Sequence, residues 1–282
     1  MECRRTATLQ RQGLARAECS LHSAAPEMST TEQPLNVRVL DGATTSVDLL
    51  LDEIRGVLAA YEQPLISFAT GATYTRMLEA LAVEMREGRV DPGAFHATHL
   101  DEYLHFPVDR QGGMVHELVG ACPPLEEMIE QGTFLPVPHD GSADALADHE
   151  QALAGLGGVR LQFLGIGRNG HLAFNEPGTA VDSRFHVTRL TAVTRRDAEG
   201  RFGEDEVPER AASAGLASIM AAERLVLCAF GENKAPAVAA MLEGDIGSDC
   251  PASLVRTHPN AIVLLDRAAC RDLRETNVTQ AT

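Results

Sequence analysis

The sequence lacks several features that would assign it to a broad class of protein. It has no apolar run of the roughly 18 to 20 residues that a membrane-spanning helix needs. Its formal net charge is −16, which disfavours nucleic acid and anionic membranes as partners. Its six cysteines form no CxxC pair, and its histidines show no HxH or HExxH spacing. We therefore expect no metal site and reduced thiols in a cytoplasmic protein.

Lysine is also nearly absent, since Lys234 is the single lysine among the 24 lysine and arginine residues. It stands in Gly231-Glu232-Asn233-Lys234, directly after the apolar run 225–230. A lysine ammonium is a compact point charge, whereas an arginine presents a planar fork. The one retained lysine is therefore a candidate contact for a phosphate group, with chance retention as the alternative.

The apolar fraction of 44% in 282 residues is enough for one large domain. Residues 1–27 differ from the rest, because they carry four arginines against three acidic residues. They lack the apolar core of about 7 to 15 residues that a secretory signal needs. An organelle transit peptide is one interpretation, and an over-extended reading frame upstream of Met28 is a simpler one. We expect a single α/β domain over 28–282, with 1–27 as a disordered extension.

From Leu35 onward, short apolar runs alternate with amphipathic stretches. This pattern predicts a mostly parallel sheet covered by helices on both faces. We expect irregular structure near 104–116 and 177–208. The expected strands are 35–40, 65–68, 97–100, 160–164, 225–230 and 261–265, and the expected helices are 46–60, 74–87, 146–156, 211–222 and 234–242.

Three polar loops follow strands of this predicted sheet, at 70–73, 101–103 and 165–176. In an open parallel sheet the ligand site lies beyond the carboxyl ends of the strands, so we expect the three loops to meet around one ligand. The loop at 165–176 holds His171 and Glu176 among glycines, and packing of such a loop requires neither side chain. His171 is a candidate acid or base, because an imidazole titrates near pH 6.5, and Glu176 nearby would orient it.

The same loop contains Gly165-x-Gly167-x-x-Gly170, which is the spacing of a dinucleotide-binding fingerprint. That fingerprint requires a long helix after the loop and an acidic residue at the end of a second strand. Asn175, Pro177 and Gly178 break such a helix within two turns. We therefore expect the glycines to let the backbone approach a small ligand instead.

The other two loops each allow two interpretations. Thr70-Gly71-Ala72-Thr73 offers hydroxyls and backbone amides to an anion at the start of a helix, but a turn with a threonine N-cap fits equally well. Asp101 and Glu102 end a strand, where a carboxylate can move a proton on a sugar carbon. Their side chains point apart on an extended segment, so we expect one to face the ligand. A helix N-cap is the alternative role.

Together these residues resemble the glucosamine-6-phosphate deaminase/isomerase family over about residues 35–268. The most specific part is Gly-Ile-Gly-Arg-Asn-Gly-His-Leu-Ala-Phe-Asn-Glu-Pro-Gly at 165–178. The resemblance implies a three-layer α/β sandwich with a Rossmann-like sheet. It also implies conversion of glucosamine 6-phosphate and water to fructose 6-phosphate and ammonia without a cofactor, and a homo-oligomer is possible. Supporting matches are Thr70-Gly71-Ala72-Thr73, Leu100-Asp101-Glu102-Tyr103, Val207-Pro208, Gly231-Glu232-Asn233-Lys234 and His258-Pro259.

The resemblance also implies roles for individual residues. Asp101 matches the base that moves a proton between C2 and C1 of the opened sugar. His171 matches the residue that opens the pyranose ring, with Glu176 as its carboxylate partner. Asn169 stands where relatives have aspartate or asparagine, and an amide orients His171 without stabilising its cation. The phosphorylated amino sugar is expected to contact Thr70, Gly71, Ala72, Thr73, Gly167, Arg201 and Lys234.

Two segments depart from the family's pattern. Residues 109–115 replace the usual His-Pro-x-Ser-Tyr-x-x-Phe-Met, which leaves the choice of substrate open. His186 and Thr188 stand where allosteric members carry basic residues. We therefore expect no activation by an amino-sugar phosphate.

Three other functions stay open. A 6-phosphogluconolactonase shares the architecture and a similar loop, but it is expected to continue with Ala-Ser-Leu-Phe-Pro where this chain has Ala-Phe-Asn-Glu-Pro at 173–177. A sugar-phosphate sensor would carry a DNA-binding helix pair and lose the acid and base residues. An isomerase could also act on a related amino-sugar phosphate, such as the galactosamine epimer. The spacing of residues in the sequence does not distinguish these epimeric substrates.

Overall fold

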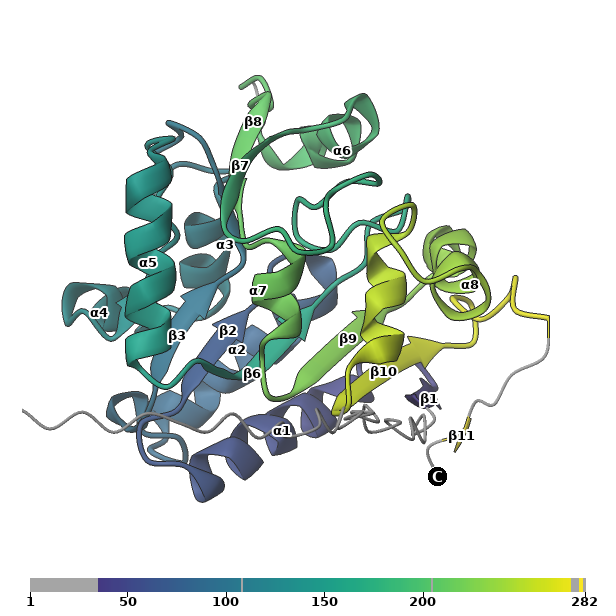
Figure 1. The fold of residues 1–282 in the computed structure, drawn as a ribbon. Helices are drawn as coiled ribbons and strands as arrows, with labels where there is room; N and C mark the ends of the chain where they lie inside the picture. Colours follow the sequence, from purple (N-terminus) through teal and green to yellow (C-terminus); the bar gives the residue numbers. More distant parts are fainter. Residues whose placement is uncertain (1–34, 108, 204, 275–278, 281–282) are drawn as a thin grey trace, which may run out of the picture. The chain divides into compact units, whose positions relative to one another are not determined.

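A parallel β-sheet forms the centre of the fold in the computed structural model, which describes residues 35–107, 109–203, 205–274 and 279–280. Among these residues the sheet has eight strands in the order β11-β1-β10-β9-β6-β2-β3-β5, and all neighbours are parallel (Figure 1). All six strands expected from the sequence are present. The bounds are β1 (Asn36–Leu40), β2 (Leu65–Phe68), β3 (His96–His99), β5 (Phe134–Leu135), β6 (Val159–Leu164), β9 (Leu225–Ala229), β10 (Ala261–Asp266) and β11 (Thr279–Gln280).

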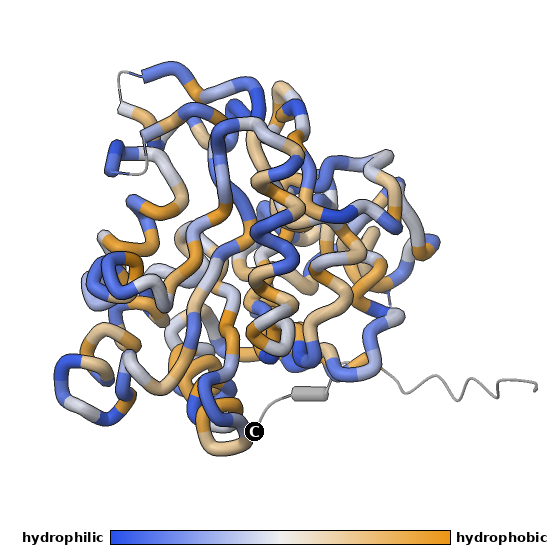
Figure 2. The backbone as a smooth tube through the Cα atoms, turned by 60° about the vertical axis from the view of Figure 1, so that its left-hand side comes forward, coloured by the Kyte–Doolittle hydropathy of each residue, from blue (hydrophilic) through white to orange (hydrophobic). Residues whose placement is uncertain are grey.

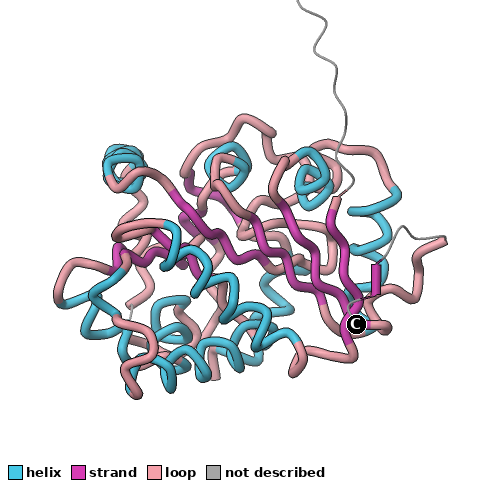
Figure 3. The backbone as a smooth tube through the Cα atoms, turned by 90° about the horizontal axis from the view of Figure 1, so that it is seen from below, coloured by secondary structure: helices cyan, strands magenta, loops and turns pink. Residues whose placement is uncertain are grey.

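Helices cover both faces of this sheet, as the view from below shows (Figure 3). Helices α1 to α4 pack together on one face, and α5, α7, α8 and the 3₁₀ helix η4 cover the other. This is the three-layer α/β sandwich that the resemblance implies. The bounds are α1 (Ser46–Ala60), α2 (Ala72–Arg86), α3 (Met114–Ala121), α4 (Pro124–Glu130), α5 (Ala143–Gly155), α7 (Leu216–Met220), α8 (Ala235–Glu243), η1 (Pro92–Ala94), η3 (Glu232–Lys234) and η4 (Pro251–Thr257).

Burial explains why these segments adopt these forms. Strands β2 and β9 are buried along their whole length, as expected for strands covered on both faces. Helix α1 buries Leu50, Leu51 and Ile54 at the spacing of one helix face. Hydrophobic and hydrophilic segments alternate along the backbone (Figure 2). The apolar pattern of the sequence is therefore sufficient to predict the main sheet.

The candidate loops follow four adjacent strands. β9, β6, β2 and β3 are consecutive in the sheet and parallel, so their carboxyl ends lie at one edge. The segment 231–234 follows β9, the loop 165–176 follows β6, and the turn 70–73 follows β2. Asp101 is the second residue after the end of β3. The expectation that these segments meet at one edge of the sheet is confirmed.

A second, antiparallel sheet begins where β3 ends. Its order is β4-β8-β7, with β4 at Asp101–Tyr103, β8 at Arg210–Ser213 and β7 at His186–Arg189. The predicted helix over 211–222 is wrong in its first half, because 210–213 form the central strand of this sheet. Alanine favours a helix by propensity. Here Ala211 and Ala212 are fully buried, and pairing with β4 and β7 decides their conformation.

Both segments expected to be irregular contain regular structure. Residues 177–208 include β7, helix α6 (Ala192–Ala198) and the 3₁₀ helix η2 (Glu199–Arg201), and α3 begins at the end of 104–116. Helix α6 has seven residues, which is too short for a helical period to emerge from the sequence. Its N-cap is Thr191, whose Oγ1 accepts the N–H of Thr194 at 3.2 Å.

The described residues form one compact unit. None of the helices that the structure describes combines the length and the hydropathy needed to cross a bilayer. The described residues also contain no group of three or more His, Cys, Asp or Glu side chains that could hold a metal ion. Residues 1–27, expected to lie outside the domain, are not among the described residues, and that expectation stays a prediction.

Candidate active site

After β6 the chain forms a tight loop whose backbone folds back on itself. The N–H of Gly167 donates to the carbonyl of His171 at 3.0 Å, and the N–H of Gly170 donates to the carbonyl of Gly167 at 3.0 Å. A dinucleotide-binding fingerprint requires a long helix directly after the loop. In the described loop no helix begins before Pro177, which agrees with the prediction that this loop is not such a fingerprint. A Cβ atom on Gly167 would lie 2.2 Å from the His171 ring. Glycine at this position therefore allows the imidazole to lie against the loop.

Glu176 is buried and receives hydrogen bonds on both carboxylate oxygens. Oε2 accepts from Asn169 Nδ2 at 2.7 Å and lies 3.7 Å from His171 Nδ1. Oε1 accepts from the hydroxyls of Thr191 and Thr194. Burial favours the neutral carboxyl, but His171, Thr194 and Asn169 together lower the pKa of Glu176 to about 2. Glu176 is therefore an anion beside His171 at neutral pH.

His171 is held by its backbone and faces a carboxylate. Its N–H donates to Asn169 Oδ1 at 3.3 Å, while the Nδ2 atom of the same amide donates to Glu176. The 3.7 Å separation between the imidazole Nδ1 and Glu176 is longer than a direct hydrogen bond. The side chain of His171 is 17% exposed. The structure thus brings together Asn169, His171 and Glu176, three of the four residues expected to be catalytic.

The fourth, Asp101, occupies the first position of β4 and is 8% exposed. Burial raises the pKa of this carboxyl to about 7, the Glu102 carboxylate adds to the effect, and the Arg201 charge opposes it. A carboxyl group that is half protonated near neutral pH can both accept and return a proton. Asp101 therefore has the property that a proton-transfer base requires.

The neighbouring carboxylate, Glu102, has a structural role. It is fully buried and accepts the N–H groups of Tyr103, Met114 and Val115 at 2.9, 3.0 and 2.9 Å. Met114 and Val115 open α3, so Glu102 satisfies the first N–H groups of that helix. Glu102 thus has the capping role, and on an extended strand the neighbouring Asp101 side chain is expected to point the other way.

Strand β8 connects Asp101 to the loop that holds His171. Asp101 pairs with Ser213 across the β4–β8 ladder. The Oγ atom of Ser213 accepts the N–H of Phe174 at 3.1 Å, and Asn175 Nδ2 donates to the carbonyl of Ala214 at 2.7 Å. Both of these loop residues lie between His171 and Glu176. The proton-transfer candidate and the imidazole loop are therefore joined by one hydrogen-bonded strand.

Arg201, an expected phosphate contact, lies in η2 on the same side as Asp101. Its Nη1 is 3.1 Å from Glu117 Oε1, and its Nη2 is 3.3 Å from the hydroxyl of Tyr103. The Arg201 charge acts on Asp101, whose pKa it lowers. In this structure the guanidinium is thus paired with a carboxylate of α3.

Met114 connects Arg201 to the turn after β2. The Oγ1 atom of Thr70 lies 3.1 Å from Met114 Sδ, and Arg201 Nη1 lies 4.0 Å from the same sulfur. Gly71 is the N-cap of α2 with φ of 91°, and no side chain caps this helix end. The threonine N-cap interpretation of this turn is therefore wrong. Two expected phosphate contacts, Thr70 and Arg201, flank one methionine.

Lys234 connects the loop after β9 to the loop after β6. Its Nζ donates to the carbonyl of Ile166 at 2.7 Å. Burial lowers the pKa of its ammonium, and the nearby Asp197 carboxylate opposes this shift. Arg168, on the same loop as Ile166, pairs with Asp197 of α6. The single lysine thus lies between the glycine-rich loop and α6.

Residues 41–264 match the model of a family described as glucosamine-6-phosphate isomerases/6-phosphogluconolactonase. The chain belongs to this family. A Streptomyces avermitilis protein named glucosamine-6-phosphate deaminase is 35% identical over 249 residues, covering 85% of this chain and 93% of that protein. A Cutibacterium acnes protein of the same name is 37% identical over 227 residues, covering 79% of this chain and 86% of that protein.

Solved structures share the fold of this glucosamine-6-phosphate isomerase/6-phosphogluconolactonase family member. A monomeric glucosamine-6-phosphate deaminase superposes with a TM-score of 0.75 at 26% identity, over 84% of this chain and 100% of that chain. A 6-phosphogluconolactonase from Leishmania guyanensis superposes with a TM-score of 0.68 at 16% identity, over 86% of this chain and 100% of that chain. The second likeness shows the fold alone.

Thr191, Thr194 and Glu117 are not among the site residues predicted for this family member. The two threonines are spaced as an N-cap and its third helical residue, and that spacing could have marked the start of α6. Glu117 had no such signal, because a glutamate on a short helix is usually solvated. Its contact with Arg201 depends on segments 84 residues apart.

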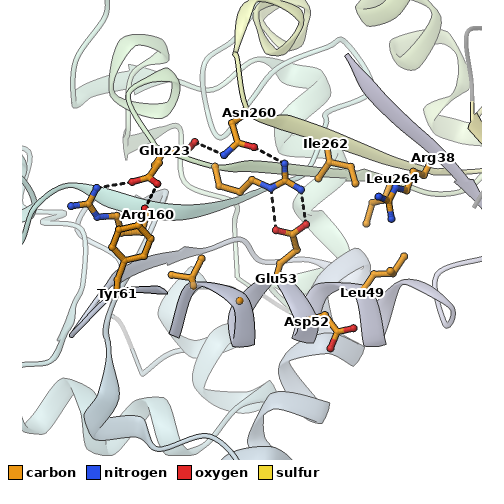
Figure 4. A pocket seen from close by; sticks show the side chains of 13 residues that line it. Arg38, Leu49, Asp52, Glu53, Tyr61, Arg160, Glu223, Asn260, Ile262 and Leu264 are labelled. Atoms are coloured by element: carbon orange, nitrogen blue, oxygen red, sulfur yellow. Dashed lines mark hydrogen bonds and ion pairs between the residues drawn. The ribbon is translucent and has the colours of Figure 1, made fainter. Parts of the chain in front are cut away.

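A separate cavity of about 430 Å³ lies between α1 and the amino ends of strands (Figure 4). Arg224 pairs there with Glu53 at 2.6 Å, and Arg160 pairs with Glu223 at 2.6 Å. Glu223 and Arg224 directly precede β9, so this cavity is at the opposite ends of the strands from the family's candidate site. Dashed lines in Figure 4 mark the contacts that engage Glu53, Arg160 and Glu223.

Proposed function

We propose that this chain converts glucosamine 6-phosphate and water to fructose 6-phosphate and ammonia. The observation that carries the proposal is the pairing of Asp101 with Ser213, which also binds the loop of His171 and Glu176. Relatives named glucosamine-6-phosphate deaminase are 35 to 37% identical to the chain, which supports the same chemistry here. The substrate is then a phosphorylated amino sugar, and we place the enzyme in the cytoplasm.

In the proposed reaction His171 first opens the pyranose ring by moving a proton between the ring oxygen and the C1 hydroxyl. Glu176, an anion with a pKa of about 2, lies 3.7 Å from the imidazole Nδ1 and places a negative charge beside the ring at that step. Asn169 supports this geometry, because its amide contacts both His171 and Glu176.

Asp101 then removes the proton from C2 of the open sugar and delivers it to C1. A pKa of about 7 suits both halves of this transfer, since the carboxylate must accept a proton and its acid must release it. Water adds at C2 and ammonia leaves, which completes the atom balance. The side chain of Asp101 can act alone, because Glu102 is committed to the start of α3.

The 6-phosphate would be held by the turn Thr70-Gly71-Ala72-Thr73 together with Arg201 and Lys234, with Gly167 allowing close approach of the backbone. Support for this set comes from its placement, because Thr70 and Arg201 flank Met114 and Lys234 binds the carbonyl of Ile166. The cations carry charge of the sign that a phosphate needs.

The test is to incubate the pure full-length protein in turn with glucosamine 6-phosphate, galactosamine 6-phosphate and 6-phosphogluconolactone. We expect ammonia and fructose 6-phosphate from the first. The variant Asp101→Asn should lose roughly 10²- to 10⁴-fold in kcat. Hydrolysis of the lactone without ammonia release from either amino sugar would replace the proposal with lactonase activity. Preference for the galactosamine epimer would keep the mechanism and correct the substrate.

A further inference from the structure

Glu176 is held from two directions by segments that are far apart in the sequence. One oxygen, Oε2, faces Asn169 and His171 within its own loop. The other, Oε1, accepts the Thr191 hydroxyl at 3.2 Å, the Thr191 N–H at 3.4 Å and the Thr194 hydroxyl. The threonines lie 15 and 18 residues after Glu176. The orientation of the carboxylate therefore depends on a second segment of chain.

The hydroxyl protons can be assigned by counting donors. Each threonine has one O–H to donate. Thr194 Oγ1 makes its closest contact with Glu176 Oε1, so its proton goes there. Thr191 Oγ1 lies 3.1 Å from Thr194 Oγ1 and 3.2 Å from Oε1. Its proton supports Oε1 either directly or through the Thr194 hydroxyl, and both arrangements end on the same oxygen.

We propose that Thr191 and Thr194 are positioning residues for the reaction, because they hold Oε1 of Glu176 so that Oε2 stays directed at His171 and Asn169. The proposal rests on the proposed role of Glu176 as the partner of His171. The terminal torsion of a glutamate is broad and roughly two-fold. With donors on one oxygen alone, the carboxylate could rotate and lose its alignment with the imidazole.

The two threonines differ in their other structural roles. Thr191 is also the N-cap of α6, since its Oγ1 accepts the N–H of Thr194 at 3.2 Å. The cap bond uses the backbone N–H of Thr194 and not its hydroxyl, and Thr194 is 5% exposed beside Glu176. Thr194 is therefore the cleaner position to change. His171, whose Nδ1 lies 3.7 Å from Glu176 Oε2, is a titratable group that lowers the pKa of Glu176.

The experiment compares Thr194→Val, which keeps the shape and removes the donor, with Thr194→Ser, which keeps the donor. Thr188→Val on β7 is the matched control, because Thr188 is not one of the donors to Glu176. We expect Thr194→Val to lower kcat by about 10-fold or more with KM for glucosamine 6-phosphate little changed. Thr194→Ser should stay within about 3-fold, and Thr188→Val should match the parent chain.

The pKa of Glu176 distinguishes positioning from a structural role. Removing a donor to an anion raises the pKa of that anion, so the pKa of Glu176 should rise in Thr194→Val. It should not change in Thr194→Ser or Thr188→Val. Thr194→Ala removes the same donor with a smaller side chain, and it serves if the valine variant does not fold.

A readout independent of activity is a ¹³C NMR titration of the Glu176 carboxyl, assigned by its loss in Glu176→Gln. We expect its midpoint to rise in Thr194→Val and in Thr194→Ala. An unchanged midpoint and an unchanged kcat in both variants would overturn the positioning role. If the parent chain releases no ammonia but the midpoint still rises, the proposed function has failed while the contact with Glu176 stands.

Discussion

At the residue scale, Asp101 is a buried carboxyl that folding makes harder to ionise. Burial raises its pKa from 3.8 to about 7. Between these two values the folded chain keeps a proton that the unfolded chain has released, so rising pH favours unfolding across that window. Above pH 7 the accumulated loss is on the order of 4 kcal/mol. The feature that suits Asp101 to proton transfer therefore lowers the stability of the fold.

We predict that Asp101→Asn is more stable than the parent chain at pH 8 by about 1 to 4 kcal/mol. The amide has nearly the same shape and pays no ionisation penalty. Urea unfolding at pH 8 and at pH 4 checks this, because near pH 4 the folded carboxyl is neutral and most of the difference should vanish. Equal stability of the two proteins at pH 8 would contradict the raised pKa.

Gly167 and Gly165 make a matched pair within one loop. A Cβ atom on Gly167 would lie 2.2 Å from the His171 ring, whereas one on Gly165 would meet nothing within 4 Å. We predict that Gly167→Ala displaces the imidazole and lowers kcat by about 100-fold, the scale of a misplaced catalytic group. Gly165→Ala should stay within about 3-fold. Steady-state assays of both variants with glucosamine 6-phosphate decide, and equal rates would show that His171 can move aside without loss.

At the element scale, the turn between β8 and α7 is closed by the backbone of 183–184. The N–H of Ala217 donates to the carbonyl of Ser183 at 2.9 Å, and the N–H of Leu216 donates to Ser183 Oγ at 2.9 Å. A Cβ atom on Gly215 would lie 2.2 Å from the backbone oxygens of both Ser183 and Arg184. Backbone atoms cannot move aside as the end of a flexible side chain can.

We predict that Gly215→Ala destabilises the fold by about 2 kcal/mol or more, because β8 and α7 must separate from 183–184 to admit the methyl group. Gly120→Ala, in helix α3, is the control, because a Cβ atom there would meet nothing within 4 Å. It should be neutral or stabilising by about 0.5 kcal/mol. Chemical denaturation of both variants makes the comparison. Equal denaturation midpoints would mean that the turn accommodates a Cβ atom at Gly215 and would contradict the prediction.

At the scale of the whole molecule, cooperative regulation needs a second ligand site that responds to an effector. The resemblance matches His186 and Thr188 to positions where allosteric members carry basic residues, and both lie on β7. His186 Nδ1 is 2.9 Å from the carbonyl of Arg184. A threonine hydroxyl brings no charge to an anionic effector.

We therefore predict hyperbolic dependence of rate on glucosamine 6-phosphate, with no activation by N-acetylglucosamine 6-phosphate. Initial rates over a wide substrate range, with and without the acetylated sugar, give the answer. Sigmoidal kinetics that become hyperbolic when the effector is added would contradict the prediction and indicate a regulatory site built from other residues.

The main sheet could be predicted because its strands are continuous apolar runs such as 225–230. An apolar run of this length predicts a buried strand from local composition alone. The glycine-rich loop with His171 and Glu176 could be predicted because polar residues there break that pattern. The strand at 210–213 could not be predicted, because its alanines favour a helix locally. It is a strand only because β4 and β7 pair with it.

The sequence by itself therefore determined the layered fold, the edge of the sheet that carries the loops, and the residue types at the candidate site. Only the tertiary structure decided that Glu102 caps α3, that Ser213 joins Asp101 to the His171 loop, and that Thr191 and Thr194 hold Glu176. The reason is physical. Local periodicity encodes which side of a segment is buried, whereas a hydrogen bond between distant segments exists only after both have been placed.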